Sequence, residues 1–273
     1  MNAPFGTRLA DAVAARGPLC VGIDPHAPLL ERWGLPDSPE GLARFTDAVV
    51  DALAGSVAVL KPQLAFYERH GSRGVAVLEA AVVRARAAGA LVLLDAKRGD
   101  IGSTMDAYAD YLRPEHPLPV DAMTVSPFLG PGSLQPAVDT ARQNGGGLFV
   151  LARTSNPDAG TFQHALVGER SVAQAVVDTV AGWNAEDAAS GPGSFGVVVG
   201  ATLREMDVDL GGLGGPVLAP GLGAQGGSVA DLRRLFGPDL TVVPTVSRDV
   251  LAAGPDASAL RSAADRWAAE LAG

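Results

Sequence analysis

The sequence has almost no cysteine. Its 273 residues include one, Cys20, which has no second cysteine in the chain for a disulfide. This excludes the secreted folds that are built on disulfides. No unbroken apolar run reaches the roughly 18 residues that a transmembrane helix needs, and the first eight residues show no apolar leader pattern. We therefore expect a soluble protein of the cytoplasm.

Positive charge is also scarce. The chain carries 21 Lys plus Arg against 30 Asp plus Glu, a formal net charge of −9. Nucleic acids and anionic membranes are bound through basic surfaces, so we predict neither as a partner. A small anionic ligand stays compatible with this charge, because it responds to the groups inside its own cleft.

Lysine itself is rare. Only two of the 21 basic residues are lysines, Lys61 and Lys97. In a chain so biased toward arginine, a retained lysine indicates a position where the larger guanidinium, which effectively never loses its proton, cannot substitute. The alternative is that two lysines remain by chance on the surface, and their placement in the fold distinguishes the two interpretations.

Eight short apolar runs alternate with amphipathic segments. The runs are apolar at successive positions, which is typical of parallel strands covered on both faces. We predict strands at 19–24, 56–63, 91–97, 122–127, 147–154, 195–202, 215–223 and 240–248, and helices at 7–15, 41–54, 73–88, 133–143, 171–189 and 256–271. This order predicts an α/β (β/α)₈ TIM barrel, a single domain over residues 1–273 with an extra N-terminal helix. A doubly wound open sheet is the alternative.

Charged residues gather at the ends of the predicted strands. Asp24 ends the first strand, Lys61 lies in the second, Asp95 and Lys97 end the third, and Arg248 ends the eighth. Because the active site of such a barrel lies at the carboxyl ends of its strands, both lysines are expected at the catalytic face. This placement favours a functional role for the pair.

Asp95 and Lys97 are two positions apart on one strand, so their side chains should share the interior face. Asp100 follows in a loop opened by Gly99. With Lys61, these two acids and two ammonium groups sum to zero charge, so the array can stay ionised in a dry pocket and hold an acid beside a reacting centre. A purely structural ion-pair network is the alternative.

A glycine-rich loop at 219–228 follows the seventh strand. Glycine allows backbone N–H groups to approach an anion, and we expect the N-terminus of the next helix to favour negative charge. Loops after strands seven and eight often bind phosphate in barrels, and Arg248 would add a cation. The loop also matches G-x-G-x-x-G, but in the seventh unit this is a weak dinucleotide signal.

His26, His70, His116 and His164 lack metal-ligand spacing, so no metal site is predicted.

The run 95–104 resembles a known family. Asp95, Lys97, Asp100, Ile101 and Thr104 match the D-x-K-x-x-D-I-x-x-T motif of orotidine 5′-phosphate decarboxylases. The resemblance extends over nearly the whole chain. It includes Val-Gly-Ile-Asp-Pro at 21–25, Leu-Lys-Pro at 60–62, Pro-Gly-Leu-Gly-Ala-Gln-Gly-Gly at 220–227 and Val-Ser-Arg at 246–248, and residues 152–157 are similar to the longer bacterial subgroup.

The resemblance implies decarboxylation of orotidine 5′-monophosphate to UMP, the last step of pyrimidine synthesis, without cofactor or metal. Lys61, Asp95 and Lys97 would form the catalytic array, with Lys97 as the proton donor. Asp100, with Ile101 and Thr104, would enter the active site of the partner subunit in a homodimer.

The substrate-binding residues are implied in the same way. Asp24 would hold the ribose, and Ser155 would contact the pyrimidine, with Thr154 as the alternative. Gln225 and Arg248 would close over the phosphate. Pro220 and Gly226 complete the implied set.

Three other functions remain open on the residues. The D-x-K-x-x-D motif is shared with Mg²⁺-dependent sugar-phosphate decarboxylases. An aldolase barrel would use Lys97 or Lys61 as a Schiff-base amine. A phospholigand-binding barrel would not be an enzyme, but phosphate binding alone does not need the acid–base array.

Overall fold

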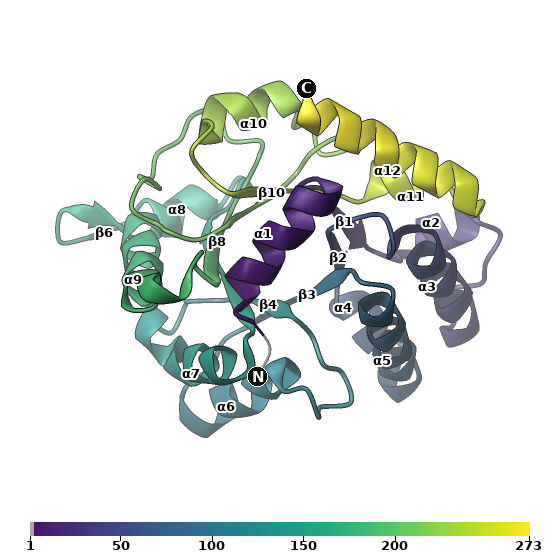
Figure 1. Ribbon diagram of the computed structural model, residues 1–273, viewed down its shortest axis with the longest axis horizontal. Helices are drawn as coiled ribbons and strands as arrows, with labels where there is room; N and C mark the ends of the chain where they lie inside the picture. Colours follow the sequence, from purple (N-terminus) through teal and green to yellow (C-terminus); the bar gives the residue numbers. More distant parts are fainter. Residues whose placement is uncertain (1–2) are drawn as a thin grey trace.

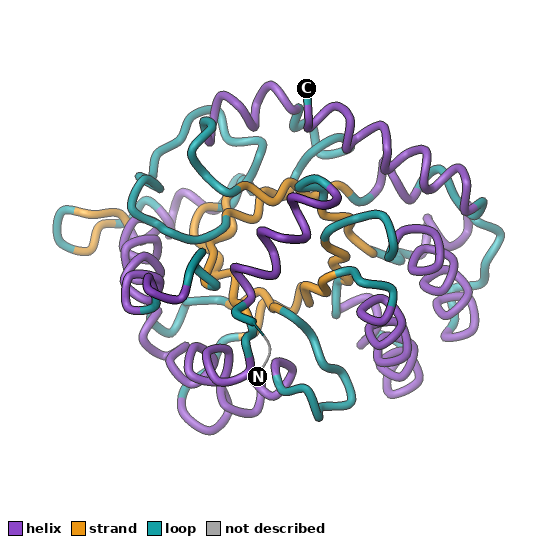
Figure 2. Tube along the Cα trace, viewed as in Figure 1, coloured by secondary structure: helices purple, strands orange, loops and turns teal. Residues whose placement is uncertain are grey.

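The computed structural model describes residues 3–273, and eight parallel strands in it close into a barrel (Figure 2). The strands are β1 (Cys20–Ile23), β2 (Val59–Pro62), β3 (Leu91–Arg98), β4 (Ala122–Val125), β5 (Gly147–Arg153), β8 (Phe195–Val199), β9 (Val217–Pro220) and β10 (Val242–Val246). The order β1-β10-β9-β8-β5-β4-β3-β2 returns to its start. The TIM-barrel prediction is confirmed, and the alternative of an open sheet is wrong because the first and last strands pair. Residues 1 and 2 of the predicted domain lie outside the described residues.

The strands are buried on both faces, as the continuous apolar runs predicted. Every residue of β1, β2 and β4 is buried. The outer face packs against helices that surround the barrel (Figure 1). The principal ones are α3 (Pro39–Leu53), α5 (Gly71–Ala87), α7 (Gln135–Asn144), α9 (Val172–Glu186), α10 (Val229–Phe236) and α12 (Ala257–Ala272). No helix within residues 3–273 is both long enough and apolar enough to cross a membrane.

Helix α3 illustrates how sequence sets these elements. Ser38 caps its N-terminus by accepting a hydrogen bond from the Gly41 N–H, and Pro39 occupies the first turn, where no N–H is needed. Leu42 and Phe45 recur at helical spacing and are fully buried against the barrel. The cap and the apolar face together define where the helix begins and how it packs.

The N-terminal helix α1 (Phe5–Arg16) lies across one end of the barrel (Figure 1). Phe5 and Leu9 are buried in a second apolar cluster with residues from the starts of the strands. The ring of Phe5 meets Phe149 of β5 edge to face, with 6.0 Å between centroids. Helix α1 therefore covers the amino ends of the strands, at the end of the barrel opposite the carboxyl ends.

The short elements of the carboxyl-end loops were not predicted. They are α2 (Ala27–Arg32), α4 (Ala65–Glu68), α6 (Gly102–Ala109), α8 (Ala159–Gln163), α11 (Arg248–Leu251) and a hairpin of β6 (Leu166–Val167) and β7 (Arg170–Ser171). Each has eight residues or fewer, too short for a periodic pattern to be recognised in the sequence. Several of them position the residues of the site.

Candidate active site

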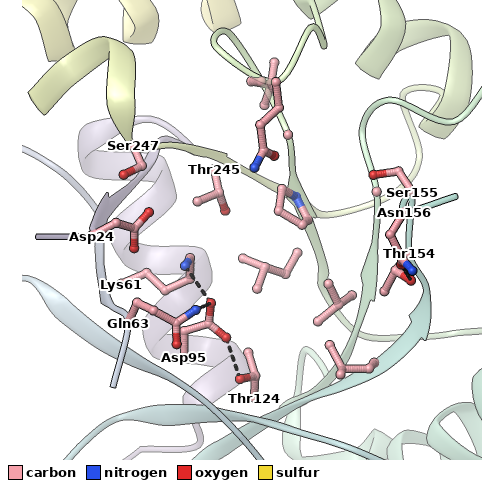
Figure 3. A pocket seen from close by; sticks show the side chains of 18 of the residues that line it. Asp24, Lys61, Gln63, Asp95, Thr124, Thr154, Ser155, Asn156, Thr245 and Ser247 are labelled. Carbon is pink, nitrogen blue, oxygen red and sulfur yellow. Dashed lines mark hydrogen bonds and ion pairs between the residues drawn. The ribbon is translucent and has the colours of Figure 1, made fainter. Parts of the chain in front are cut away.

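A cavity of about 400 Å³ opens at the carboxyl ends of the strands. Its wall includes eight of the predicted site residues, namely Asp24, Lys61, Asp95, Lys97, Ser155, Pro220, Gln225 and Arg248. In Figure 3 Asp24, Lys61 and Asp95 lie on one side of the cavity, and the segment 154–156 after β5 lies on the other. Both lysines therefore lie at the cavity, and neither is a chance surface lysine.

The carboxylate of Asp95 is the centre of the charged array. Its Oδ2 accepts hydrogen bonds from Lys61 Nζ at 3.0 Å and Gln63 Nε2 at 2.9 Å. Its Oδ1 accepts from Lys97 Nζ at 2.6 Å and Thr124 Oγ1 at 2.8 Å. Four donors from three strand ends thus hold one carboxylate in a single orientation, as Figure 3 shows for three of them.

Lys61 lies beneath this carboxylate with 7% of its side chain exposed. Burial alone would lower the pKa of its ammonium, but the nearby carboxylates of Asp95 and Asp24 outweigh it, so the pKa lies above its ordinary value. Lys61 is therefore a permanent positive charge at the floor of the cavity.

Asp95 is shifted the other way. Burial opposes its ionisation, but the ammonium groups of Lys61 and Lys97 more than offset this, and its pKa lies far below the ordinary value of 3.8. A depressed folded-state pKa stabilises the fold above the unfolded pKa, and this stabilisation is lost as pH falls.

We predict the consequence for Asp95→Asn. Between pH 6 and 5 the Asp95 carboxyl is ionised in both the folded and the unfolded chain. The wild type therefore keeps its full advantage in unfolding free energy over the variant. Below about pH 4 the advantage should shrink by at most roughly 1.4 kcal/mol per pH unit, because the unfolded chain takes up a proton that folded Asp95 refuses. Urea unfolding at pH 6, 4 and 3 measures this. A difference that grows on acidification would contradict the assigned shift.

Lys97 departs from regular strand geometry. Its φ of 48° is in the left-handed region, and the pairing of β3 with β4 shifts register between Leu94 and Arg98. Such a backbone costs about 1–3 kcal/mol in a non-glycine residue. The Lys97 N–H is held by Thr124 Oγ1 at 3.0 Å. The side chain is 45% exposed rather than dry, and it still reaches Asp95.

The rest of the D-x-K-x-x-D-I-x-x-T run does not line the cavity of its own chain. Asp100 turns back on the backbone, where its Oδ1 accepts a hydrogen bond from the Ile101 N–H at 2.8 Å. Ile101 is 61% exposed, and Thr104 is exposed on α6. The structure brings together Lys61, Asp95 and Lys97 but leaves Asp100 outside, so the local four-residue array expected from spacing is not formed within one chain.

The glycine-rich loop after β9 contributes Pro220 and Gln225 to the cavity, and α11 contributes Arg248. Gly223 has φ 67°, a left-handed conformation that favours glycine, and a Cβ there would lie 2.0 Å from Asp249 Oδ2 of α11. Gly226 does not line the cavity, and its N–H instead closes a turn on the Gly223 carbonyl at 2.7 Å.

The N-terminus of the next helix already carries negative charge from the chain itself. The N-terminus of α10 is closed by a capping box in which Ser228 and Asp231 satisfy each other's backbone N–H groups. The Asp231 carboxylate already supplies negative charge there. The capping box satisfies the Ser228 and Asp231 N–H groups, and Arg248 is the cation that lines the cavity beside this loop.

The segment after β5 separates two hydroxyls that the sequence could not rank. Thr154 Oγ1 accepts from Gln163 Nε2 at 2.8 Å and donates to Asn156 Oδ1 at 2.6 Å. Its hydroxyl is thus engaged within the protein. Both residues line the cavity, and Ser155 is exposed on its wall (Figure 3).

Sequence reasoning missed several residues of the cavity. Gln63, Thr124, Asn156, Thr245 and Ser247 all line it. Gln63 lies two positions after Lys61, and that spacing could have predicted it. The Asp24 Oδ1 and Ser247 Oγ atoms are buried without a hydrogen-bond partner within residues 3–273.

The residues set aside in the sequence stay apart from this chemistry. Cys20 is buried in the second apolar cluster, together with Phe5 and Leu9, and burial raises the pKa of its thiol to about 12. None of the four histidines lines the cavity. Among the described residues, no group of three or more His, Cys, Asp or Glu is arranged to hold a metal ion.

A scan against family models matches residues 17–263 to the orotidine 5′-phosphate decarboxylase / HUMPS family. The chain belongs to this family. An orotidine 5′-phosphate decarboxylase of Streptomyces coelicolor is 62% identical over 98% of this chain and 97% of its own length, and one of Salinispora arenicola is 61% identical over 97% and 96%. The family resemblance predicted from the motif is confirmed.

Solved structures of this family agree. A Streptomyces avermitilis crystal structure under the same designation superposes with a TM-score of 0.95 at 59% identity, covering 99% of this chain and 95% of that one. The Leishmania donovani OMP decarboxylase gives 0.74 at 30% identity, over 98% of each chain. The decarboxylase family and the barrel that carries the charged array are thus established together.

Proposed function

We propose that this chain decarboxylates orotidine 5′-monophosphate to UMP and CO₂, the final step of UMP biosynthesis. The observation that carries the proposal is the Lys61–Asp95–Lys97 array at the cavity. Relatives about 60% identical over nearly their whole length are named orotidine 5′-phosphate decarboxylases.

Lys97 acts as the proton donor. When the bond between the ring carbon and the carboxylate breaks, the electron pair stays on a carbon with no conjugated sink. The Lys97 ammonium stabilises that charge and transfers its proton to the same carbon as CO₂ leaves, and solvent then restores the lysine. Fixed charges of this kind supply much of catalysis because they need no reorganisation.

Asp95 and Lys61 keep this proton donor in place. Asp95 is held ionised by both ammonium groups and fixes Lys97 Nζ at 2.6 Å. Its negative charge also lies where a substrate carboxylate enters, which favours loss of CO₂. Lys61 keeps Asp95 charged when Lys97 gives up its proton.

The other parts of the substrate, its ribose, pyrimidine and phosphate, are bound by residues elsewhere in the cavity. Asp24 binds the ribose, and Ser155 contacts the pyrimidine, since the Thr154 hydroxyl is engaged within the protein. Gln225 and Arg248 bind the phosphate, alongside Pro220 and the loop that contains Gly226. Binding energy at the phosphate assists the distant chemistry when closure orders the charged array.

The active form is a homodimer that shares its sites. Asp100, Ile101 and Thr104 lie outside the cavity of their own chain and enter the site of a second copy. Ile101 is 61% exposed, and the apolar side chains of Phe128 and Leu129 are 70% and 53% exposed, which suits an interface that buries them. The chain acts as one domain in the cytoplasm, where its lone cysteine stays reduced.

The reaction needs no metal or cofactor. Both oxygens of Asp95 already accept hydrogen bonds from ammonium groups, so a Mg²⁺ ion would have to displace them. The test is an absorbance assay of orotidine 5′-monophosphate consumption with and without EDTA, for which we expect equal rates. Loss of activity in EDTA that Mg²⁺ restores would favour the sugar-phosphate decarboxylase chemistry. Reductive trapping by borohydride with a keto-sugar phosphate would favour the aldolase.

A further inference from the structure

The cavity wall opposite Asp24 is held by a residue that does not line the cavity. Gln163, at the end of α8, places its amide against the segment 154–156. Its Oε1 accepts from the Thr154 N–H at 2.9 Å, and its Nε2 donates to Thr154 Oγ1 at 2.8 Å. One side chain therefore holds both the backbone and the hydroxyl of Thr154.

The hydrogen bonds of Thr154 extend to Asn156, a residue that lines the cavity. Thr154 Oγ1 donates to Asn156 Oδ1 at 2.6 Å, and Asn156 lines the cavity with Ser155 between them. A hydroxyl that accepts from Gln163 directs its own proton toward Asn156. The amide of Gln163 thus orders the hydrogen bonds of Thr154 and Asn156, the two neighbours of Ser155.

A salt bridge supports the same segment, and its arginine also donates from Nη1 to Gln163 Oε1 at 3.4 Å. The Arg153 guanidinium donates from Nη1 to the Thr154 carbonyl at 2.7 Å and from Nε to both Asp207 oxygens at 2.9 Å. Asp207 lies in the connection between β8 and β9, and its Oδ2 also meets His164 Nε2 at 2.8 Å. The loops after β5 and β8 are joined through this pair.

Ser155 lies directly against Gly200, the residue that follows β8. A Cβ at Gly200 would lie 2.9 Å from the Ser155 Cβ and 3.1 Å from its backbone nitrogen. The end of β8 therefore borders Ser155 closely on one side, and only glycine at position 200 leaves room for it. The position of the Ser155 hydroxyl depends on what holds Thr154.

We infer that Gln163 is a positioning residue for the pyrimidine end of the substrate. It acts through Thr154 to set Ser155 and Asn156 before a nucleotide arrives, so that binding does not have to order them. The inference rests on the proposed function, which assigns this wall to the base and the loops after β9 and β10 to the phosphate.

The test is Gln163→Ala, with affinities measured for UMP and for ribose 5-phosphate, which lacks the base. We expect UMP affinity and 1/KM for orotidine 5′-monophosphate to fall roughly tenfold, with kcat changed less than about threefold. Ribose 5-phosphate affinity and the melting temperature should be unchanged. Gln143→Ala, the same substitution at an exposed position outside the cavity, is the matched control.

Thr154→Val provides the second arm, because it removes the hydroxyl between Gln163 and Asn156 and keeps the side-chain shape. Its effect on UMP should not add to that of Gln163→Ala in the double variant. Equal loss of UMP and ribose 5-phosphate binding, or no loss of either, would overturn the positioning role. Failure of the unmodified chain to consume orotidine 5′-monophosphate would instead refute the proposed function. The affinities for UMP and ribose 5-phosphate would still test the positioning role in that case, because they do not depend on turnover.

Discussion

Replacing Lys97 with alanine should abolish turnover of orotidine 5′-monophosphate while UMP still binds. Lys97 Nζ is 2.6 Å from Asp95 Oδ1 and faces a cavity whose other lysine is buried below the carboxylate. No second ammonium in the array can replace it as donor, because Lys61 is fixed at the floor. We expect kcat to fall by at least about a thousandfold, the combined loss of an acid and of a fixed charge.

UMP affinity should change less than about fivefold in the same variant, because its ribose and phosphate contacts are assigned to other strands. Asp95 also stays compensated by Lys61 and two neutral donors. Stopped assays give kcat, and calorimetry gives UMP binding. Arg98→Ala is the control, since it removes a positive charge one position away, where Arg98 pairs with Glu68 outside the cavity. Turnover near the unmodified rate in Lys97→Ala would remove Lys97 from the role of acid.

Two inactive variants should restore activity when they are combined. Asp100→Ala and Lys97→Ala each lose activity alone if every site uses Lys97 of one subunit and Asp100 of the other. In a mixed dimer, one site carries both substitutions and the other carries neither. With random exchange, half of the dimers are mixed, so about a quarter of the unmodified activity should return.

The complementation is measured after unfolding and refolding the mixture, with tagged chains to count the mixed dimers. Mixing Lys97→Ala with Asp95→Asn is the control, because both residues serve the same cavity and no intact site can form. Abundant mixed dimers without recovered activity would show that Asp100 does not act across the interface. The placement of Asp100 outside its own cavity, with its carboxylate on the Ile101 N–H, is what motivates the experiment.

The fold could be predicted because its signals are local. Each strand of the barrel is a run of buried residues, and each principal helix carries an apolar face, so the period of the pattern reports the element. Parallel strands that alternate with helices place all carboxyl ends at one face of the barrel. The sequence therefore predicts that Lys61 and Lys97 lie close together. The hairpin at 166–171 and the short loop helices carry no such period and were missed.

The sequence by itself determined the barrel, the charged residues at its mouth and the family, because these depend on residue type and spacing along one chain. Only the tertiary structure decided how they meet. The left-handed backbone at Lys97, the four donors on Asp95 and the engagement of Thr154 by Gln163 arise from contacts between distant strands and loops. The capping of α10 and the turning of Asp100 away from its own cavity have the same origin. Spacing predicts that side chains share a face, whereas register and hydrogen bonding between elements decide which of them touch.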